Sequence, residues 1–283
     1  MNILVTGGSG FVGKEMITLL LSHGHHVTNI DLKESHIDDI TEIIHDLTHS
    51  YSSVHGSNVC IHLASAVGGI VFNCETFDLI EYNDRINANV LSMCQQSGSR
   101  LIFVSSVNVL ENAEVCDDIP PMPSSKYAQS KIKGEDLFVN NLPDCVVVRP
   151  TNLFGKSQIS SFYSYGTSHV IPDLLHKIRE ASHCINVWGD GCQMRNFLHV
   201  YDFCEFIMSL ISAESVETFN AVGSSITVSI SELAACLMDF DNMELKINYD
   251  NQYMQYESMH VENFLSCIKD VSTIQSIQEG LLI

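Results

Sequence analysis

The sequence predicts a doubly wound α/β fold, in which helices cover both faces of a mostly parallel sheet, followed by a smaller α/β lobe. Three observations support this. Short apolar runs alternate with helical patterns through residues 1–150, as expected for strands that are buried on both faces. The first run leads directly into a glycine-rich turn and an amphipathic segment. The chain has 283 residues and is 45% hydrophobic, enough for one large domain or two modest lobes.

The first lobe is predicted to span residues 1–150. Because strands alternate with helices there, we expect one parallel sheet. Strands are expected at Ile3–Thr6, His26–Ile30, Val59–Leu63, Leu101–Ser105 and Cys145–Arg149, and helices at Phe11–Ser22, Asp38–His45, Asp84–Gln96 and Lys126–Asn140.

The second lobe is predicted to span residues 151–283 and to interleave partly with the first. Its pattern is less regular, and residues 196–215 are expected to pack back on the first lobe. We expect a loop at 157–168, a helix at Ile171–Glu180, a strand at Ile185–Trp188 and a helix at Val200–Ser212.

The charge of the chain excludes two classes of partner. Its 34 acidic and 14 basic residues give a formal net charge of −20. Nucleic acids and anionic membranes are bound by basic surfaces, so neither is an expected partner. An anionic ligand would have to be held by local positive charges, because the overall field repels it.

The cysteines indicate neither a metal site nor a disulfide framework. There are ten, without a C-x-x-C pair, and the closest two, Cys184 and Cys192, are eight positions apart. Reduced thiols are therefore expected. No apolar stretch reaches the ~18 residues of a membrane span. Together these features predict a cytoplasmic protein with no metal ion.

The turn "TGGSGFVG" after the first strand is the most informative stretch. Gly7, Gly10 and Gly13 would permit a tight turn, a close approach of the backbone to a pyrophosphate, and close packing of helix on sheet. The helix that begins there would direct its N-terminus at the negative charge. A dinucleotide cofactor is therefore predicted.

The cofactor is expected to be NAD in preference to NADP. Asp31 comes at the end of the second strand, where a carboxylate can accept hydrogen bonds from a ribose diol and would repel a 2′-phosphate. Lys33 follows two positions later and would offset part of this repulsion.

Several stretches, in order along the chain, resemble the extended short-chain dehydrogenase/reductases, the nucleotide-sugar epimerase/dehydratase family with a Rossmann fold. Besides the glycine turn, they are Asp46–Leu47, "HLAS" at 62–65, "FVSSVNV" with Ser106, the pair Tyr127 and Lys131, and "RPTNLFG". The resemblance implies a cofactor bound by Gly7, Gly10, Phe11, Val12, Gly13, Asp31, Asp46, Leu47, Leu63, Ala64, Ser65, Tyr127, Lys131, Pro150, Asn152 and Leu153.

The resemblance also implies a catalytic set of Ser106, Tyr127, Lys131 and His169. Tyr127 would exchange a proton with a sugar C4 oxygen, Ser106 would hydrogen-bond that oxygen, and His169 would be a base. Lys131 and the nicotinamide are expected to lower the pKa of Tyr127, since positive charge favours the phenolate.

Longer stretches resemble the GDP-L-fucose synthase group within that family: "VGGIVFN" at 67–73, "SHVIPDLLHKI" at 168–178 and "VWGDGCQMRNFLHV" at 187–200. They imply a nucleotide-linked keto sugar, with GDP as the expected nucleotide, and a homodimer through the helices at 84–96 and 126–140. The substrate would be bound by Val67, Gly68, Ser106, Val107, Asn108, Asn152, His169, Lys177, Trp188 and Arg195.

One departure bears on the reaction. Asn108 stands where the group has a cysteine that acts as an acid in epimerisation, and an amide is neither acid nor base near neutral pH. Reduction at C4 with reduced or absent epimerisation is therefore expected. Two alternatives stay open: a redox-neutral NAD-dependent 4-epimerase or dehydratase, and a non-enzymatic redox-sensing or scaffold protein that only binds NAD(P).

Overall fold

The largest sheet reverses its strand order beside its first strand. The computed structural model describes residues 1–283 except 52–55, 70–77, 111–124, 160–167 and 251–267. In those described residues the sheet has eight strands in the order β13-β10-β6-β5-β4-β1-β2-β3, and every neighbouring pair is parallel. Its strands are β1 (Asn2–Thr6), β2 (His26–Asp31), β3 (Thr41–Ile44), β4 (Val59–His62), β5 (Arg100–Val104), β6 (Cys145–Pro150), β10 (Phe219–Gly223) and β13 (Lys269–Asp270). The order from β3 to β6 is that of a Rossmann fold, which confirms the predicted fold class.

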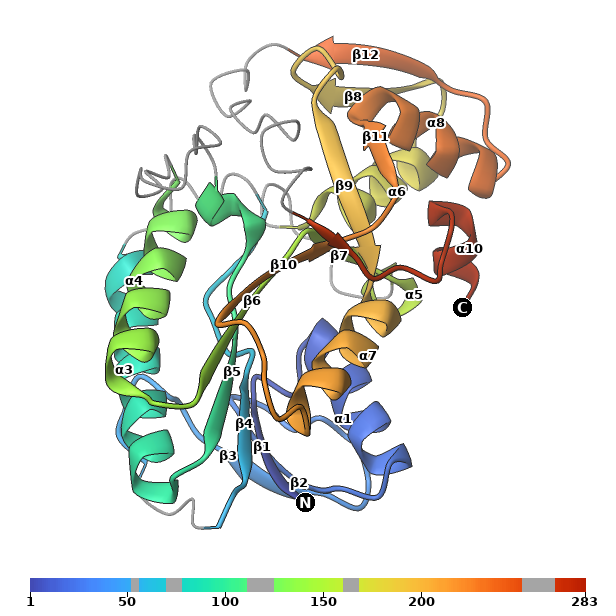
Figure 1. Ribbon diagram of the computed structural model, residues 1–283. Coiled ribbons are helices and arrows are strands. Elements are labelled where there is room, and N and C mark those ends of the chain that lie inside the picture. The colour runs from blue at the N-terminus through green and yellow to red at the C-terminus, as the bar shows by residue number, and fades with distance from the viewer. Residues whose placement is uncertain (52–55, 70–77, 111–124, 160–167, 251–267) are drawn as a thin grey trace.

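Helices cover both faces of this sheet (Figure 1). One face carries α1 (Phe11–Ser22) and α7 (Val200–Ile211), and the other carries α3 (Leu79–Ser97) and α4 (Lys126–Asn141). Successive side chains of β1 point to opposite faces, so Val5 packs in the core under α1 and α7, and Leu4 packs in the core under α3 and α4. The apolar runs of the sequence are continuous because both faces are buried.

The C-terminal part of the chain forms a smaller α/β unit with its own core (Figure 1). Phe154, Leu175 and Leu237 are buried in that core. Its elements are the sheet β11-β9-β7 with β7 (Asn152–Phe154), β9 (Met194–His199) and β11 (Thr227–Ser229), the pair β12-β8 with β8 (Cys184–Trp188) and β12 (Lys246–Asp250), and the helices α5 (Lys156–Ile159), α6 (Val170–Glu180), α8 (Ile230–Phe240) and α10 (Ile277–Leu282).

Most of the predicted elements are confirmed to within a few residues, and α1 has the predicted bounds. The helix predicted at Asp38–His45 is wrong, because Thr41–Ile44 forms β3 and pairs with β2. Upstream of β3, His36 and Asp39 have positive φ angles of 60° and 63°. A right-handed helix does not allow such angles, and Asp39 lies within the predicted helix. Pairing at the sheet edge therefore overrides the local pattern.

The loop predicted at 157–168 is wrong in its first part, since α5 occupies Lys156–Ile159; residues 160–167 lie outside the described residues. The division of the chain at residue 150 stays a prediction. Beyond it, β10 and β13 join the large sheet, and α7 shares a core with α1. None of the helices in the described ranges is long and apolar enough to cross a membrane.

A buried carboxylate ties the C-terminal segment to the start of α7. Asp202 is only 2% exposed, and its oxygens accept hydrogen bonds from the Thr273 amide at 3.0 Å, the Thr273 hydroxyl and the Ile274 amide at 3.1 Å. His199 caps α7 through Nδ1 and contacts the Gly280 carbonyl oxygen through Nε2 at 3.0 Å. The C-terminal segment is thus held by polar contacts to two buried side chains, Asp202 and His199.

Replacing Asp202→Ala removes the acceptor of these three donors, of which the Ile274 amide is in a buried contact. We expect the free energy of unfolding to fall by about 3 kcal/mol, the scale for several lost hydrogen bonds to a buried charge. Urea unfolding measures the change. The matched control is Glu214→Ala, which removes the same charge from an exposed position; equal stability of the two variants would contradict the assignment.

Candidate active site

The candidate site lies where the strand order reverses, at the carboxyl ends of β1 and β4. Ligands of open α/β sheets bind at such a point, since the chains that leave the two strands diverge there. The glycine turn leaves β1, and Leu63–Ser65 leave β4. The Gly7 amide donates to the Ile30 carbonyl at 2.9 Å, and the Leu63 amide to the Thr6 carbonyl at 3.0 Å. The two segments therefore run beside each other.

Two glycines of the turn have a steric requirement. Gly7 has a φ angle of 76°, and a Cβ on it would lie 2.6 Å from the Ala64 amide nitrogen. A Cβ on Gly13 would collide with the Gly7 carbonyl oxygen. The turn is thus packed too closely for any side chain at these positions. The predicted neighbours Gly10, Phe11 and Val12 form the N-cap and the first residues of α1.

Asp31 lies beside the glycine turn, as its predicted role requires. Its Oδ2 accepts from the Ser9 amide at 2.9 Å, and its Oδ1 accepts from the Leu32 amide at 2.6 Å. The carboxylate is therefore held at the rim of the turn while each oxygen keeps a further lone pair for a ligand.

Asp46, one of the predicted cofactor residues, is engaged within the protein. Asp46 accepts from the amide and hydroxyl of Thr48 at 2.9 and 2.8 Å, and the amide hydrogen bond is the largest cause that lowers the pKa of Asp46. The Leu47 side chain is buried in the core under α3, and its carbonyl oxygen accepts from the Asn89 side-chain amide at 2.8 Å.

The sequence reasoning missed one buried residue next to this site. His62 ends β4, and its ring nitrogens contact the Thr6 hydroxyl at 2.7 Å and the Asn87 amide oxygen at 3.0 Å. Burial lowers the pKa of His62 to about 3, so the ring is neutral. It thereby joins β1, β4 and α3 behind the glycine turn. The "HLAS" stretch contains it, but its pairing with Thr6 depends on the sheet.

Ser106 comes together with Tyr127 and Lys131 of α4, although it lies on a different element. Ser106 follows β5, at the start of the turn that leads into η1 (Val107–Leu110), and hydrogen-bonds the Tyr127 hydroxyl. Lys131 lies one turn after Tyr127 on α4, is buried, and donates from Nζ to the Val104 carbonyl at 2.9 Å. Its ammonium is 5.7 Å from the centre of the Tyr127 ring. Three of the four predicted catalytic residues are therefore adjacent.

The pKa of Tyr127 differs from the expectation. Burial raises it to about 12, and the hydrogen bond from Ser106 lowers it only in part. The predicted lowering is wrong for the protein by itself, because desolvation of the phenolate outweighs the hydrogen bond from Ser106. Burial lowers the pKa of Lys131 to about 8, and Glu135 opposes that shift. At neutral pH the tyrosine therefore keeps its proton and the lysine is charged.

Glu135 is a second residue that the sequence did not indicate. It is buried on α4 one turn after Lys131, and Arg149 of β6 donates to it from Nε at 2.9 Å. Because this ion pair joins α4 to β6, it fixes the helix that carries Tyr127 and Lys131.

The predicted substrate residues of the C-terminal unit divide into two groups. His169 is the N-cap residue of α6. Water reaches its ring, but the protein around it lowers its pKa by desolvation. Lys177 forms an ion pair with Asp173 at 2.7 Å, and its ammonium is 4.9 Å from the centre of the Trp188 ring. The Lys177 charge is thus already paired within the protein.

The other predicted residues lie on strands or in the segment that follows β4. Asn152 donates to the Asn196 carbonyl at 2.9 Å and so joins β7 to β9. Arg195 lies on β9 and donates to the Met194 carbonyl at 2.8 Å. Pro150 ends β6, and Leu153 packs against the core under α1 and α7. Val67 is exposed, Gly68 is buried, and residues 70–73 of that stretch lie outside the described residues.

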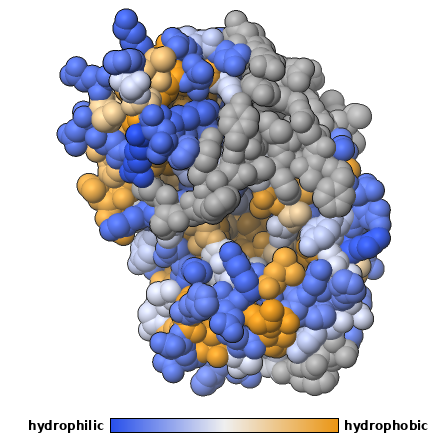
Figure 2. Space-filling model, turned by 180° about the vertical axis from the view of Figure 1, so that it is seen from behind, coloured by the Kyte–Doolittle hydropathy of each residue, from blue (hydrophilic) through white to orange (hydrophobic). Residues whose placement is uncertain are grey.

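The site has polar atoms for a ligand to satisfy. Among the described residues, the buried hydroxyls of Ser105 and Thr151 have no hydrogen-bond partner. They follow β5 and β6 directly, at the carboxyl edge of the sheet. The face in Figure 2 is recessed in its middle, with hydrophobic side chains in the recess. Together with the glycine cradle and Asp31, these groups fit a dinucleotide.

Comparison with known proteins decides the family. A model of the NAD dependent epimerase/dehydratase family matches residues 3–221.

The chain belongs to this family. It is an NAD-dependent enzyme of the extended short-chain dehydrogenase/reductase type. GDP-L-fucose synthase 1 of Arabidopsis thaliana is 29% identical over 88% of this chain and 80% of its own. GDP-mannose 3,5-epimerase 1 of Oryza sativa subsp. indica is 25% identical over 88% of this chain and 71% of its own. Among solved structures, UDP-glucose 4-epimerase of Thermotoga maritima superposes with a TM-score of 0.80 at 20% identity, covering 99% and 96% of the two chains.

The buried Lys131 makes stability depend on pH. Its pKa is about 8 in the folded protein and about 10.4 when unfolded. Between these values the unfolded chain binds more protons, so the free energy of unfolding rises with pH. We expect Lys131 to raise the free energy of unfolding by about 2 kcal/mol between pH 8 and pH 10. This pH-dependent increase should be absent in Lys131→Met.

Urea unfolding of wild type and variant at both pH values measures this difference. The control is Lys133→Met on the same helix, where the lysine is exposed and paired with Asp84. If the free energies of unfolding of wild type and Lys131→Met differ by the same amount at both pH values, the lysine does not titrate as a buried group.

Proposed function

We propose that the protein is a nucleotide-sugar oxidoreductase that acts at C4 of a GDP-linked 4-keto-6-deoxy sugar, prefers NAD to NADP, and epimerises little or not at all. The observation that carries the proposal is the Ser106–Tyr127–Lys131 set at the end of β5. The named activities of the two plant relatives, GDP-L-fucose synthase and GDP-mannose 3,5-epimerase, support a GDP-linked substrate.

The states of the catalytic groups suit reduction. A bound reduced nicotinamide supplies the hydride to C4. The Tyr127 hydroxyl, protonated at neutral pH, gives its proton to the C4 oxygen, and Ser106 hydrogen-bonds the same oxygen. The Lys131 ammonium then stabilises the phenolate that Tyr127 leaves behind. Its bond to the Val104 carbonyl keeps it in place during this step.

Asn108 limits the reaction to C4. Epimerisation beside a ketone needs a base on one face of the ring and an acid on the other. We assign the base role to His169. Asn108 lies within η1, and its backbone amide donates to the Ser106 hydroxyl at 3.2 Å. Its side-chain amide cannot supply the acid. A proton removed by His169 alone would return to the same face, which exchanges hydrogen without inversion.

A redox-neutral reaction is the second candidate. Asp31 beside the glycine turn favours NAD, and an enzyme that regenerates its cofactor in each cycle has no need of NADPH. Product analysis separates the two candidates: mass spectrometry and proton NMR of the product from GDP-4-keto-6-deoxymannose, with NADH and NADPH supplied separately. Consumption of reduced cofactor with a C4 alcohol as product supports the first. A homodimer through α3 and α4 stays a prediction.

Tyr127→Phe tests the proton donor. We expect turnover to fall by about a hundredfold or more, since general acid catalysis contributes that much, while cofactor affinity stays within about twofold. Steady-state assays measure turnover, and titration with NADH measures cofactor affinity. Tyr201→Phe, at an exposed position on α7, is the control. Full turnover in Tyr127→Phe would remove Tyr127 from the mechanism.

Asn108→Cys tests the missing acid. In deuterated water, wild type should give a product whose C3 and C5 keep their configuration. The thiol of the variant supplies an acid, so inversion and deuterium at C3 or C5 should increase by about tenfold or more. Proton NMR of the products measures both. Wild-type product inverted at both carbons would refute the proposed restriction.

A further inference from the structure

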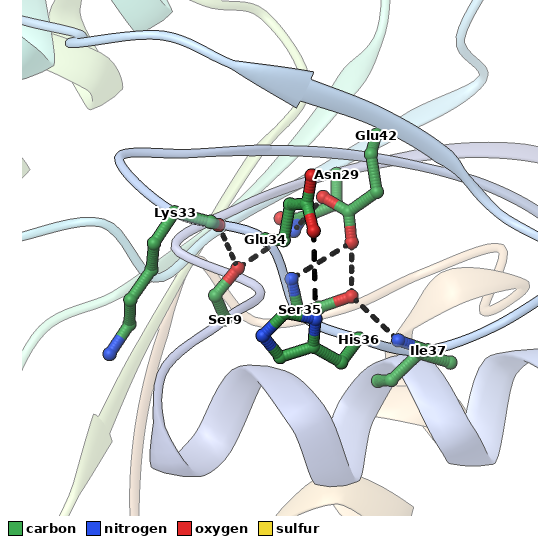
Figure 3. A network of polar contacts seen from close by, with 8 residues as sticks. All are labelled: Ser9, Asn29, Lys33, Glu34, Ser35, His36, Ile37 and Glu42. Atoms are coloured by element: carbon green, nitrogen blue, oxygen red, sulfur yellow. Dashed lines mark hydrogen bonds and ion pairs between the residues drawn. The ribbon is translucent and has the colours of Figure 1, made fainter.

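A polar network behind the glycine turn links it to the edge of the sheet (Figure 3). Its centre is Asn29 on β2, which is fully buried. The Asn29 side-chain oxygen accepts from the Gly8 amide at 3.0 Å, and its nitrogen donates to the Ser9 hydroxyl at 3.1 Å and to Glu42 Oε2 at 3.0 Å. Every polar atom of this side chain is therefore used, and the turn is connected to β3 through it.

The other oxygen of Glu42 holds the segment between β2 and β3. Glu42 Oε1 accepts from the Ser35 amide at 3.1 Å and from the Ser35 hydroxyl. Ser35 is 1% exposed, and its hydroxyl oxygen also accepts from the Ile37 amide at 3.2 Å. One carboxylate thus serves as the acceptor for two buried partners from different segments.

The connection between β2 and β3 gives Glu42 this importance. Parallel strands usually need a crossover of about a dozen or more residues, most often a helix. Here residues 32–40 join them without a helix. Ile37 and Ile40 of this segment pack against the core. Its polar anchors are Glu42 and the Ser9 hydroxyl, which donates to the Lys33 carbonyl at 2.6 Å.

Residues 32–40 begin directly after Asp31, and Ser9 contacts both Asp31 and this segment. The Ser9 amide binds Asp31 Oδ2, and the Ser9 hydroxyl binds the backbone two residues after Asp31. Loss of Glu42 would leave Asn29 and Ser35 donors buried without an acceptor, which costs free energy until the segment moves. Movement would shift Asp31 from the rim of the turn and free Lys33 to approach a 2′-phosphate.

We propose that Glu42 is a positioning residue for the adenosine end of the cofactor: through Asn29 and Ser35 it fixes Asp31 and Lys33 beside the glycine turn, and so sets the preference for NAD over NADP. The inference rests on the proposed preference for NAD. In this role Glu42 does not contact the cofactor and acts only through the segment that it holds.

Calorimetric titration of purified variants with NADH and NADPH tests the proposal, and it requires no sugar substrate. Glu42→Ala should weaken NADH binding by roughly tenfold, the effect of one or two lost hydrogen bonds, and weaken NADPH binding by less than about threefold. Ser35→Ala should act in the same direction with a smaller effect. Glu42→Gln keeps an acceptor oxygen and should lie between wild type and Glu42→Ala.

The matched control is Glu34→Ala. Glu34 lies in the same segment and carries the same charge, but it is exposed and pairs only with His36 among the contacts of the described residues. It should leave both affinities within about twofold of wild type, which separates positioning from the loss of a negative charge. Far-UV circular dichroism and the melting temperature without cofactor check the fold of each variant.

Three results would overturn the proposal. In Glu42→Ala, the affinities for NADH and NADPH could fall by equal factors, or neither affinity could change. In Glu34→Ala, the affinities could change as much as in Glu42→Ala. If Glu42→Ala does not fold, Ser35→Ala and Glu42→Gln test the proposal through the same comparison, the loss of NADH affinity relative to the loss of NADPH affinity. A wild type that binds NADPH more tightly would refute the proposed cofactor preference, while the ratios of variant to wild type would still test Glu42.

Discussion

The site depends on one constraint: parallel strands place all their carboxyl ends at the same edge of the sheet. The glycine turn follows β1, Asp31 ends β2, Leu63 follows β4, Ser106 follows β5 and Pro150 ends β6. Groups from five segments that are distant in the sequence therefore meet at the ends of their strands. The reversal of order between β1 and β4 opens space at that edge, and the close contact of Gly7 with Ala64 limits what can occupy it.

Several buried polar groups hold this edge in place through specific partners. His62 is kept neutral between Thr6 and Asn87. The Glu135–Arg149 pair joins α4 to β6. A buried charge or amide without its partner is costly, so these contacts favour one arrangement of α3, α4 and the sheet over alternatives with similar hydrophobic burial.

The two units of the chain are connected by polar contacts as well as by shared core. Arg100 at the start of β5 donates from Nη1 to the carbonyl oxygens of Leu210 and Ala213 at the end of α7. Asp202 and His199, at the start of α7, hold the segment that leads to α10. Helix α7 is thus fixed at both ends, against the large sheet and against the C-terminal segment. This places the strand that precedes it, β9 with Arg195, relative to the sheet.

The sequence by itself determined the alternation of strands and helices, the glycine turn after β1 and the separation of Tyr127 from Lys131 by one helical turn. These features depend on residues close together in the chain, whose periodicity and steric limits can be read directly. Only the tertiary structure decided that residues 41–44 form a strand, since pairing with β2 outweighs their helical pattern. It also decided the direction of the Tyr127 pKa, the neutral state of His62 and the place of Glu42 in the network. Those properties depend on desolvation and on partners far away in the sequence, which are set by how the elements pack.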